Sequence, residues 1–338
     1  MFIAESYPLA IAMCLITMLC WGSWANTQKL ASKEWRFQLF YWDYAIGVFL
    51  LALVLAFTLG SSGAGGRGFL ADLQQADSKW LGSAFFGGVI FNLSNILLVA
   101  AIDIAGMAVA FPVGVGLALV LGVITTYLST RVGNAPMLGL GVAAIMVAII
   151  LDALAYKRLA SGGHKTPFKG IVISIAAGVL MGFFYKYVAQ SMGQIEPVTK
   201  TLEAGKLSPY TAIVLFSTGL LLSNFLWNSI IMVKPFTGIP VSFGDYFTKG
   251  NVRLHLVGIL GGVIWNVGMS FSIISSTKAG AALSYGLGQG ATMIGACWGV
   301  FIWKEFKGAP KGTNGLLAAM FLFYLIGLGV LISSKLNS

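Results

Sequence analysis

FGGVIFNLSN at residues 86–95 returns, little changed, as LGGVIWNVGM at residues 260–269, 174 positions further along the chain. Without gaps, the match extends over residues 87–116 and 261–290, with 10 identities in 30 positions. An apolar sequence produces some matches by chance, but paired glycines and a shared asparagine are poor candidates for coincidence. The chain therefore contains an internal repeat, which we expect to form the same structure twice.

The composition is that of a membrane protein. Of the 338 residues, 57% are hydrophobic and only 9% are charged, with a mean hydropathy of +0.86. Soluble domains carry about a quarter charged residues. Uncharged stretches such as residues 316–332 suit the roughly 20 apolar residues that a helix needs to cross a bilayer. The acid Glu5, with no basic residue before the first stretch, predicts a retained helix rather than a cleaved signal peptide.

Clusters of charge and of glycine and proline divide the chain into ten apolar segments. They lie near residues 8–27, 38–59, 80–102, 106–129, 136–156, 169–190, 209–233, 254–275, 279–303 and 313–334. The repeat separates the chain into halves 1–160 and 161–338, and an odd number of segments in each half gives the halves opposite orientations. We therefore predict an all-α membrane protein with ten transmembrane helices in two inverted five-helix repeats, a design that recurs in transporters with a site near the midplane.

Polar residues inside the apolar segments are the candidates for a binding site. An unpaired amide in hydrocarbon is costly, so we expect Asn92 and Asn266 to face a partner helix or a watery cavity, approaching one site from opposite halves. The repeated glycines have an alternative role in helix packing, and tryptophans have one as anchors at the membrane interface. The predicted substrate-binding residues are Trp21, Trp24, Asn92, Asn95, Asn228, Trp265, Asn266, Ser284, Tyr285 and Gln289.

Asp43 stands out as an acid in the otherwise uncharged second segment. A membrane-embedded acid is a functional candidate by default, and we predict that Asp43 binds the coupling proton. The neighbouring Tyr41 and Tyr44 are expected to hydrogen-bond to it, and Lys186 is a candidate ionic partner. The alternatives are an interfacial position for Asp43 and a lysine that extends its ammonium to the membrane surface.

The sequence shows no cofactor, metal or catalytic motif. Cys14, Cys20 and Cys297 lie inside apolar runs, and His164 and His255 lack the spacing of metal ligands. An enzyme in the membrane needs a reactive cluster, and none is visible, so transport is favoured over an enzyme, a receptor or a structural protein. We expect no cofactor and no bound metal.

Basic residues gather on one side of the predicted topology. The connections between segments 1–2, 3–4, 5–6, 7–8 and 9–10 hold 13 of the 21 Lys and Arg residues. Because basic loops stay in the cytoplasm, both termini are predicted on the non-cytoplasmic side. This asymmetry accounts for the net charge of +10 without a nucleic-acid partner.

The motifs together resemble two groups of the drug/metabolite transporter superfamily. GGVIWNVGMSFSIISSTKAGAALSYGLGQGATMIGACWGVFIWKEF, residues 261–306, is similar to the penultimate helical hairpin of bacterial glucose/ribose porters. The porters typically have Gly-Glu where this chain reads WKEF, with Glu305. Three further features are shared with plant ureide permeases: WGSW at Trp21–Trp24, YWDY at Tyr41–Tyr44, and Asn228 followed by Pro235. The ureide permeases have a large central loop, which is the short segment 157–169 here, so ATP is not implied.

The resemblance implies a secondary active transporter with ten helices in two inverted halves. It implies a permease that moves a small polar metabolite across the inner membrane by alternating access and coupled to protons, with a sugar as the first candidate. The alternatives are a ureide or nucleobase permease and a metabolite or drug exporter. The implied partners are the substrate, protons and the lipid bilayer, with no nucleic acid, and the expected state is a monomer, with a dimer as the alternative.

Overall fold

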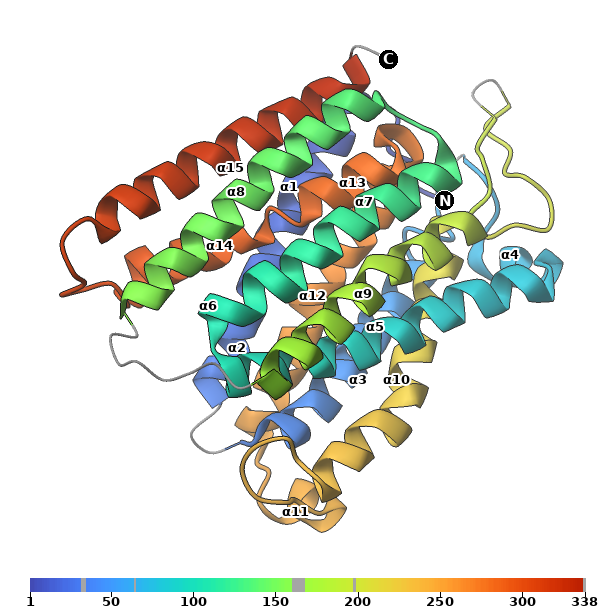
Figure 1. Cartoon of the computed structure of the whole chain (residues 1–338). Coiled ribbons are helices and arrows are strands. Elements are labelled where there is room, and N and C mark those ends of the chain that lie inside the picture. Colours follow the sequence, from blue (N-terminus) through green and yellow to red (C-terminus); the bar gives the residue numbers. More distant parts are fainter. Residues whose placement is uncertain (32–34, 64, 160–167, 197–198, 337–338) are drawn as a thin grey trace.

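The computed structural model describes residues 1–31, 35–63, 65–159, 168–196 and 199–336. Within these ranges the regular structure is helical, apart from two isolated β-bridges in the connection before α10. The predicted boundary at residues 160–161 and His164 lie outside them. Both termini lie at one end of the helical bundle and α11 (Phe243–Thr248) lies at the other (Figure 1). These ends are called the terminal end and the α11 end below.

Nine helices in the described part of the chain are long and apolar enough to cross a membrane. The first is formed by α1 (Tyr7–Ser23) together with α2 (Ala25–Ala31). The others are α3 (Phe37–Phe57), α5 (Ser78–Ala105), α7 (Gly116–Thr130) with the turn before it, α8 (Ala135–Leu159), α9 (Phe168–Ser191), α10 (Pro209–Val233), α12 (Val252–Ala279) and α15 (Thr313–Leu336).

The ninth predicted segment, residues 279–303, is not one continuous helix. It is divided into α13 (Ala281–Gly288), α14 (Ala291–Cys297) and a π-helical turn at Trp298–Ile302. The break falls between Gly288 and Ala291, beside two glycines, and glycine is a poor helix former. The expectation of a single helix was wrong because hydropathy measures apolar length and not helical continuity.

The predicted segment at residues 106–129 is also interrupted. It begins with α6 (Met107–Ala110), continues through a π-helical turn at Phe111–Val115, and then becomes α7. Pro112 lies in this turn. Proline has no backbone N–H to donate, and π-helical turns are a common way for a helix to absorb such an interruption.

Two of the long connections contain short helices, which are α4 (Phe69–Gln75) and α11. Ser242 caps α11: its hydroxyl accepts a hydrogen bond from the Asp245 backbone N–H, and the Asp245 carboxylate accepts one from the Ser242 N–H. This reciprocal pair satisfies two backbone donors at the helix start.

The repeated glycines bring pairs of helices into direct backbone contact. A Cβ atom at Gly88 of α5 would lie 1.9 Å from the Phe216 carbonyl oxygen of α10. A Cβ atom at Gly262 of α12 would lie 2.0 Å from the Tyr44 carbonyl oxygen of α3. Glycine therefore permits a close approach that any other residue would block. The packing role predicted for these glycines is confirmed, and it recurs at the 174-residue offset.

Candidate functional site

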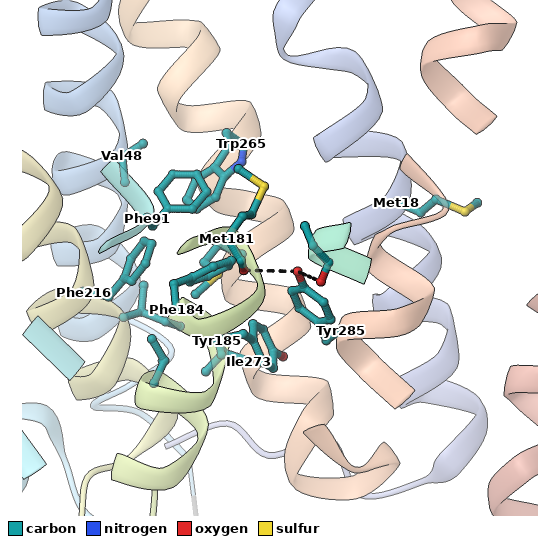
Figure 2. Packing of buried hydrophobic residues seen from close by; sticks show 14 of the residues in the cluster. Met18, Val48, Phe91, Met181, Phe184, Tyr185, Phe216, Trp265, Ile273 and Tyr285 are labelled. Carbon is teal, nitrogen blue, oxygen red and sulfur yellow. Dashed lines mark hydrogen bonds between the residues drawn. The ribbon is translucent and has the colours of Figure 1, made fainter. Parts of the chain in front are cut away.

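Six helices contribute rings to a cluster in the middle of the bundle, which we call the central aromatic cluster. Trp265 of α12 lies at its centre, with ring centroids 4.5 Å from Phe91 of α5 and 5.9 Å from Phe216 of α10. Trp21 of α1 stacks on Trp265 at 5.9 Å with an interplanar angle of 13°. Figure 2 shows Trp265, Phe91, Phe216 and Phe184 gathered from different helices. The members are Trp21, Tyr44, Phe91, Phe184, Phe216 and Trp265.

The local sequence explains why Trp265 occupies this position. Gly261 and Gly262 bring α12 against α3, and Trp265 follows them by three to four residues, so it lies on the same face one turn along the helix. Phe91 follows Gly87 and Gly88 in the same way on α5. The two rings that meet at 4.5 Å are therefore matching positions of the repeated phrase.

Among the described residues, several helices of this cluster also carry buried polar atoms without a hydrogen-bond partner. They include the Trp21 Nε1, the Tyr44 hydroxyl and the Oδ1 atoms of Asn92 and Asn266. Asn92 Nδ2 donates to Ser223 Oγ at 2.9 Å, and Asn266 Nδ2 donates to the Val48 carbonyl oxygen at 2.7 Å. An unsatisfied buried polar group costs about 1–3 kcal/mol, so these atoms are candidates to bind a ligand or water.

Asn95 and Asn228 lie closer to the α11 end. Asn95 Nδ2 donates to the Tyr41 hydroxyl at 3.1 Å, and Asn228 Nδ2 donates to the Gln38 carbonyl oxygen at 2.9 Å. Gln38 also lines a cavity of about 230 Å³ between α3, α5, α10 and the connection after α10. Asn228 therefore contacts a residue of the cavity wall, and Asn95 contacts Tyr41 one turn further along α3.

A row of rings on α3 leads from this cavity toward the cluster. Phe37 lines the cavity, and its ring centroid is 5.1 Å from that of Tyr41. Tyr41 stacks on Tyr44 at 5.1 Å, and Tyr44 meets Trp265 at 6.2 Å. Trp24 packs on Tyr44 at 4.8 Å. The row therefore connects the cavity wall to the central aromatic cluster through packed rings.

The predicted residues of the broken segment use most of their polar atoms for contacts within the protein. Ser284 Oγ donates to the Ser272 carbonyl oxygen at 2.7 Å. The Tyr285 hydroxyl lies 3.2 Å from the Ala118 carbonyl oxygen and 3.3 Å from that of Met181, as Figure 2 shows for Met181. Gln289 is buried at the turn between α13 and α14. Ser284 and Tyr285 therefore hold helices together, while Gln289 lies at the break.

Asp43 has different neighbours from those expected. It is 1% exposed in the second turn of α3. Its Oδ2 accepts a hydrogen bond from Trp35 Nε1 at 3.0 Å, and its Oδ1 lies 2.9 Å from His255 Nδ1 and accepts one from the Tyr246 hydroxyl. We call these four residues, Trp35, Asp43, Tyr246 and His255, the Asp43 cluster.

The expected partners of Asp43 were therefore wrong. Tyr41 accepts from Asn95, and Tyr44 belongs to the central aromatic cluster. Lys186 lies on α9, which packs against α5 and α7, and the side chain that contacts Asp43 from α12 is His255. His255 was missed as a functional residue. The signal that could have found it is its spacing, because His255, Gly258 and Gly262 lie on one face of a helix.

Two further acids lie at the α11 end. Glu305 pairs with Lys29 at 2.8 Å and accepts a hydrogen bond from the Tyr156 hydroxyl at 2.9 Å. Asp152 of α8 is 4% exposed, and its Oδ1 has no hydrogen-bond partner in the described part of the chain. Across the described ranges, no group of three or more His, Cys, Asp and Glu side chains is placed to hold a metal ion.

The chain is similar to known membrane permeases over its whole length. A family model described as ureide permease matches residues 40–165 and 154–334. Ureide permease 1 of Arabidopsis thaliana is 23% identical, with 99% of each chain covered. Probable ureide permease A3 of Vigna unguiculata is 27% identical over 61% of this chain and 54% of its own. Probable glucose uptake protein GlcU of Bacillus anthracis is 23% identical over 72% and 76%.

A solved crystal structure has the same fold. It superposes with a TM-score of 0.57 at 14% sequence identity, covering 96% of this chain and 98% of its own. At this identity the likeness concerns the fold alone.

Proposed function

The chain belongs to the ureide permease family, whose members are membrane transporters and not enzymes, and from this premise we propose that it moves a small polar metabolite across the membrane by alternating access. The site of transport is the central aromatic cluster with Asn92 and Asn266. The observation that carries the proposal is the combination of stacked rings with unpaired buried polar atoms on several helices.

The polar atoms favour a flat substrate that carries both N–H and C=O groups. The Oδ1 atoms of Asn92 and Asn266 need donors, while Trp21 Nε1 needs an acceptor. A ureide or a nucleobase supplies both and offers a planar face to Trp21 and Trp265. We therefore rank a ureide or nucleobase above the sugar that the sequence placed first. The relatives support this order, since Ureide permease 1 is matched over 99% of its length and the GlcU protein over 76%.

A sugar is the second candidate. Sugar rings also pack on tryptophan, and their hydroxyls both donate and accept hydrogen bonds. The GlcU relatives are named for glucose uptake, which is the observation that keeps this candidate in the comparison. A metabolite or drug exporter is the third candidate, on resemblance to the superfamily alone.

We also propose that the ten predicted segments form two inverted five-helix repeats, 1–160 and 161–338. Two pairs of contacts support this arrangement. In the first pair, Gly88 of α5 contacts the backbone of α10, and Gly262 of α12 contacts the backbone of α3. In the second pair, Gly219 of α10 approaches the Phe85 carbonyl oxygen, and Gly47 of α3 approaches that of Ile259. Phe85 and Ile259 are 174 residues apart, the offset of the repeated phrase. In such a design the two halves exchange shapes around a central site.

The remaining parts of the proposal are energy coupling and membrane placement. Asp43 binds a proton that accompanies the substrate, since it is a buried acid within a membrane-spanning helix. The protein lies in the inner membrane as a monomer. Both termini are on the non-cytoplasmic side, because the α11 end carries most of the basic connections and basic loops stay in the cytoplasm.

A thermal-shift screen of the purified protein tests the substrate class. Ureides, nucleobases, sugars and amino acids are compared at equal concentration. A ligand that binds only the folded state at about 100 times its Kd stabilises it by about 2.7 kcal/mol. We expect the largest rise in Tm from a ureide such as allantoin or a nucleobase such as uracil. A rise with glucose or ribose alone would replace the first candidate with the second.

Asn92→Ala and Asn266→Ala are each expected to weaken binding of the ligand found in that screen. Each removes one buried hydrogen bond, which contributes about 1–3 kcal/mol when the partner is left unsatisfied, or a rise in Kd of about 5- to 150-fold. Gln289→Ala is expected to act in the same direction. Isothermal titration measures the change. Asn134→Ala, which removes a cap at the start of α8, is the control, and unchanged Kd values in Asn92→Ala and Asn266→Ala would assign both asparagines to packing.

A further inference from the structure

The Asp43 cluster joins three segments that are far apart in sequence. Asp43 lies on α3, Tyr246 on α11 and His255 in the first turn of α12, and Trp35 precedes α3. Tyr246 also packs its ring against His255 at 4.7 Å and against Trp35 at 5.8 Å. One buried carboxylate therefore accepts hydrogen bonds from side chains of separate elements at the α11 end of the bundle.

This cluster is a main attachment of α11 to the bundle. The helix has only six residues and none of them is buried. Apart from Tyr246, α11 contacts the spanning helices through the ring of Phe243, whose centroid lies 5.7 Å from that of Trp42. A six-residue helix is too short to be stable by itself. Its position therefore depends on Tyr246 and on the carboxylate that Tyr246 contacts.

Glycines create the space that the cluster occupies. A Cβ atom at Gly258 would lie 2.4 Å from the Asp43 Cβ, and a Cβ atom at Gly250 would lie 2.3 Å from His255 Nε2. Gly250 ends the connection that carries α11, and Gly258 lies one turn after His255. The local sequence thus allows the carboxylate and the imidazole to meet.

The other charged groups on the surrounding elements are directed elsewhere. Asp245 of α11 pairs with Lys249, the residue after the helix, at 2.8 Å, and the hydrogen bond from Lys249 lowers the pKa of that carboxyl. Arg36 donates to the Ile239 carbonyl oxygen, and Arg253 is exposed. Burial and the contact with Asp43 raise the pKa of Tyr246, so its hydroxyl remains a donor. Asp43 and His255 are thus the two groups left to exchange a proton.

We propose that Asp43 and His255 form one proton-binding pair that controls the docking of α11, so that α11 is a latch at this end of the transporter. The proposal rests on the proposed function and specifies how the proton acts there. With one proton or none on the pair, the carboxylate accepts hydrogen bonds from both Tyr246 and His255. Such charge-assisted bonds are about twice as strong as neutral ones.

A second proton weakens these bonds, because a neutral carboxyl is a poorer hydrogen-bond acceptor than a carboxylate. The carboxyl then loses its charge, and His255 presents an N–H that faces a neutral acid. Docking of α11 is therefore present at neutral and higher pH and is lost as the pH falls and the pair takes up its second proton. Because the two groups interact directly, this titration belongs to the pair and not to either residue alone.

Release of α11 would change access to the cavity at the α11 end. The connection that carries α11 also supplies Phe236 and Thr237 to the wall of the 230 Å³ cavity. Movement of α11 therefore displaces one wall of that cavity. In this way proton binding at Asp43 and His255 is linked to access from the α11 end.

Hydrogen exchange of residues 243–248 in the full-length protein tests the proposal. It is measured without substrate at about pH 8 and about pH 4, because the second proton of the pair is the one that neutralises the carboxyl, and it is corrected for the intrinsic pH dependence of exchange. The wild-type protein is expected to exchange about tenfold faster at the lower pH, for the loss of roughly 1.5 kcal/mol of charged hydrogen bonding. Asp43→Asn, whose side chain cannot gain or lose a proton, is expected to exchange fast at both pH values and to show no such pH response.

Two further variants separate the latch from a general loss of structure. Tyr246→Phe is expected to exchange fast at both pH values because it lacks the hydroxyl. Lys249→Gln removes the ion pair between Lys249 and Asp245 and is expected to keep the wild-type pH response. Exchange that does not depend on pH in the wild type, or a response that survives Asp43→Asn, would overturn the proposal. Because no substrate is present, either result is independent of the transport assignment.

Discussion

Gly88→Val and Gly262→Val are each expected to lower the free energy of unfolding by about 3 kcal/mol or more. The first Cβ atom would lie 1.9 Å from the Phe216 carbonyl oxygen and the second 2.0 Å from that of Tyr44. Neither contact can be relieved by rotating a side chain, because the obstructing atom belongs to the backbone. Overpacking commonly costs about 1–3 kcal/mol. Because these variants must push apart two helices that touch through their backbones, we expect a cost at or above the upper end of that range.

The measurement is thermal unfolding of the detergent-solubilised protein, followed together with its monodispersity. Gly82→Val is the matched control on α5, since a Cβ atom there has nothing within 4 Å, and valine is a better helix former than glycine. The two repeat positions are expected to lose stability to a similar degree. A Tm within error of the wild type for either variant would show that the helices do not meet at these glycines.

Asp43→Asn is expected to abolish accumulation of substrate against a gradient. The variant keeps the volume of the side chain and mimics the protonated, neutral form. A neutral carboxyl crosses the occluded state at a lower desolvation cost than a carboxylate, so proton binding ties substrate movement to proton movement. With no proton to gain or lose at this site, Asp43→Asn is expected to retain substrate binding and counterflow while losing pH-driven uptake.

Reconstituted vesicles with an imposed pH gradient measure this effect. Asp77→Asn, at the start of α5 near the terminal end, is the control and is expected to accumulate substrate as the wild type does. If Asp43→Asn still accumulates substrate in response to the gradient, the coupling site lies elsewhere. The next variants would then be Asp152→Asn and Glu305→Gln.

The sequence predicted most of the helices because hydropathy and length determine which segments can cross a bilayer. It also predicted the close packing at Gly88 and Gly262, since small residues repeated in matching segments have few other uses. It did not predict the break between Gly288 and Ala291. An apolar run looks the same to a hydropathy scale whether its backbone is one helix or several.

The neighbours of Asp43 could not be read correctly from local spacing. Tyr41 and Tyr44 are two residues before and one residue after Asp43, and residues at these spacings do not share a face of a helix. The actual partners, Tyr246 and His255, are 203 and 212 residues away. Their approach depends on how α11 and α12 pack against α3, which no motif in the sequence records. Trp265 was easier to place because the repeated glycines fix its face of α12.

Uptake by the wild-type protein in vesicles tests the central claim most directly. The purified protein is reconstituted, a pH gradient is imposed, and labelled uracil, allantoin and glucose are supplied in parallel, with protein-free vesicles as the blank. The account predicts saturable accumulation of uracil or allantoin that collapses when the gradient is removed with a protonophore. Uptake of all three compounds at the level of protein-free vesicles, in protein that is folded and correctly inserted, would contradict it.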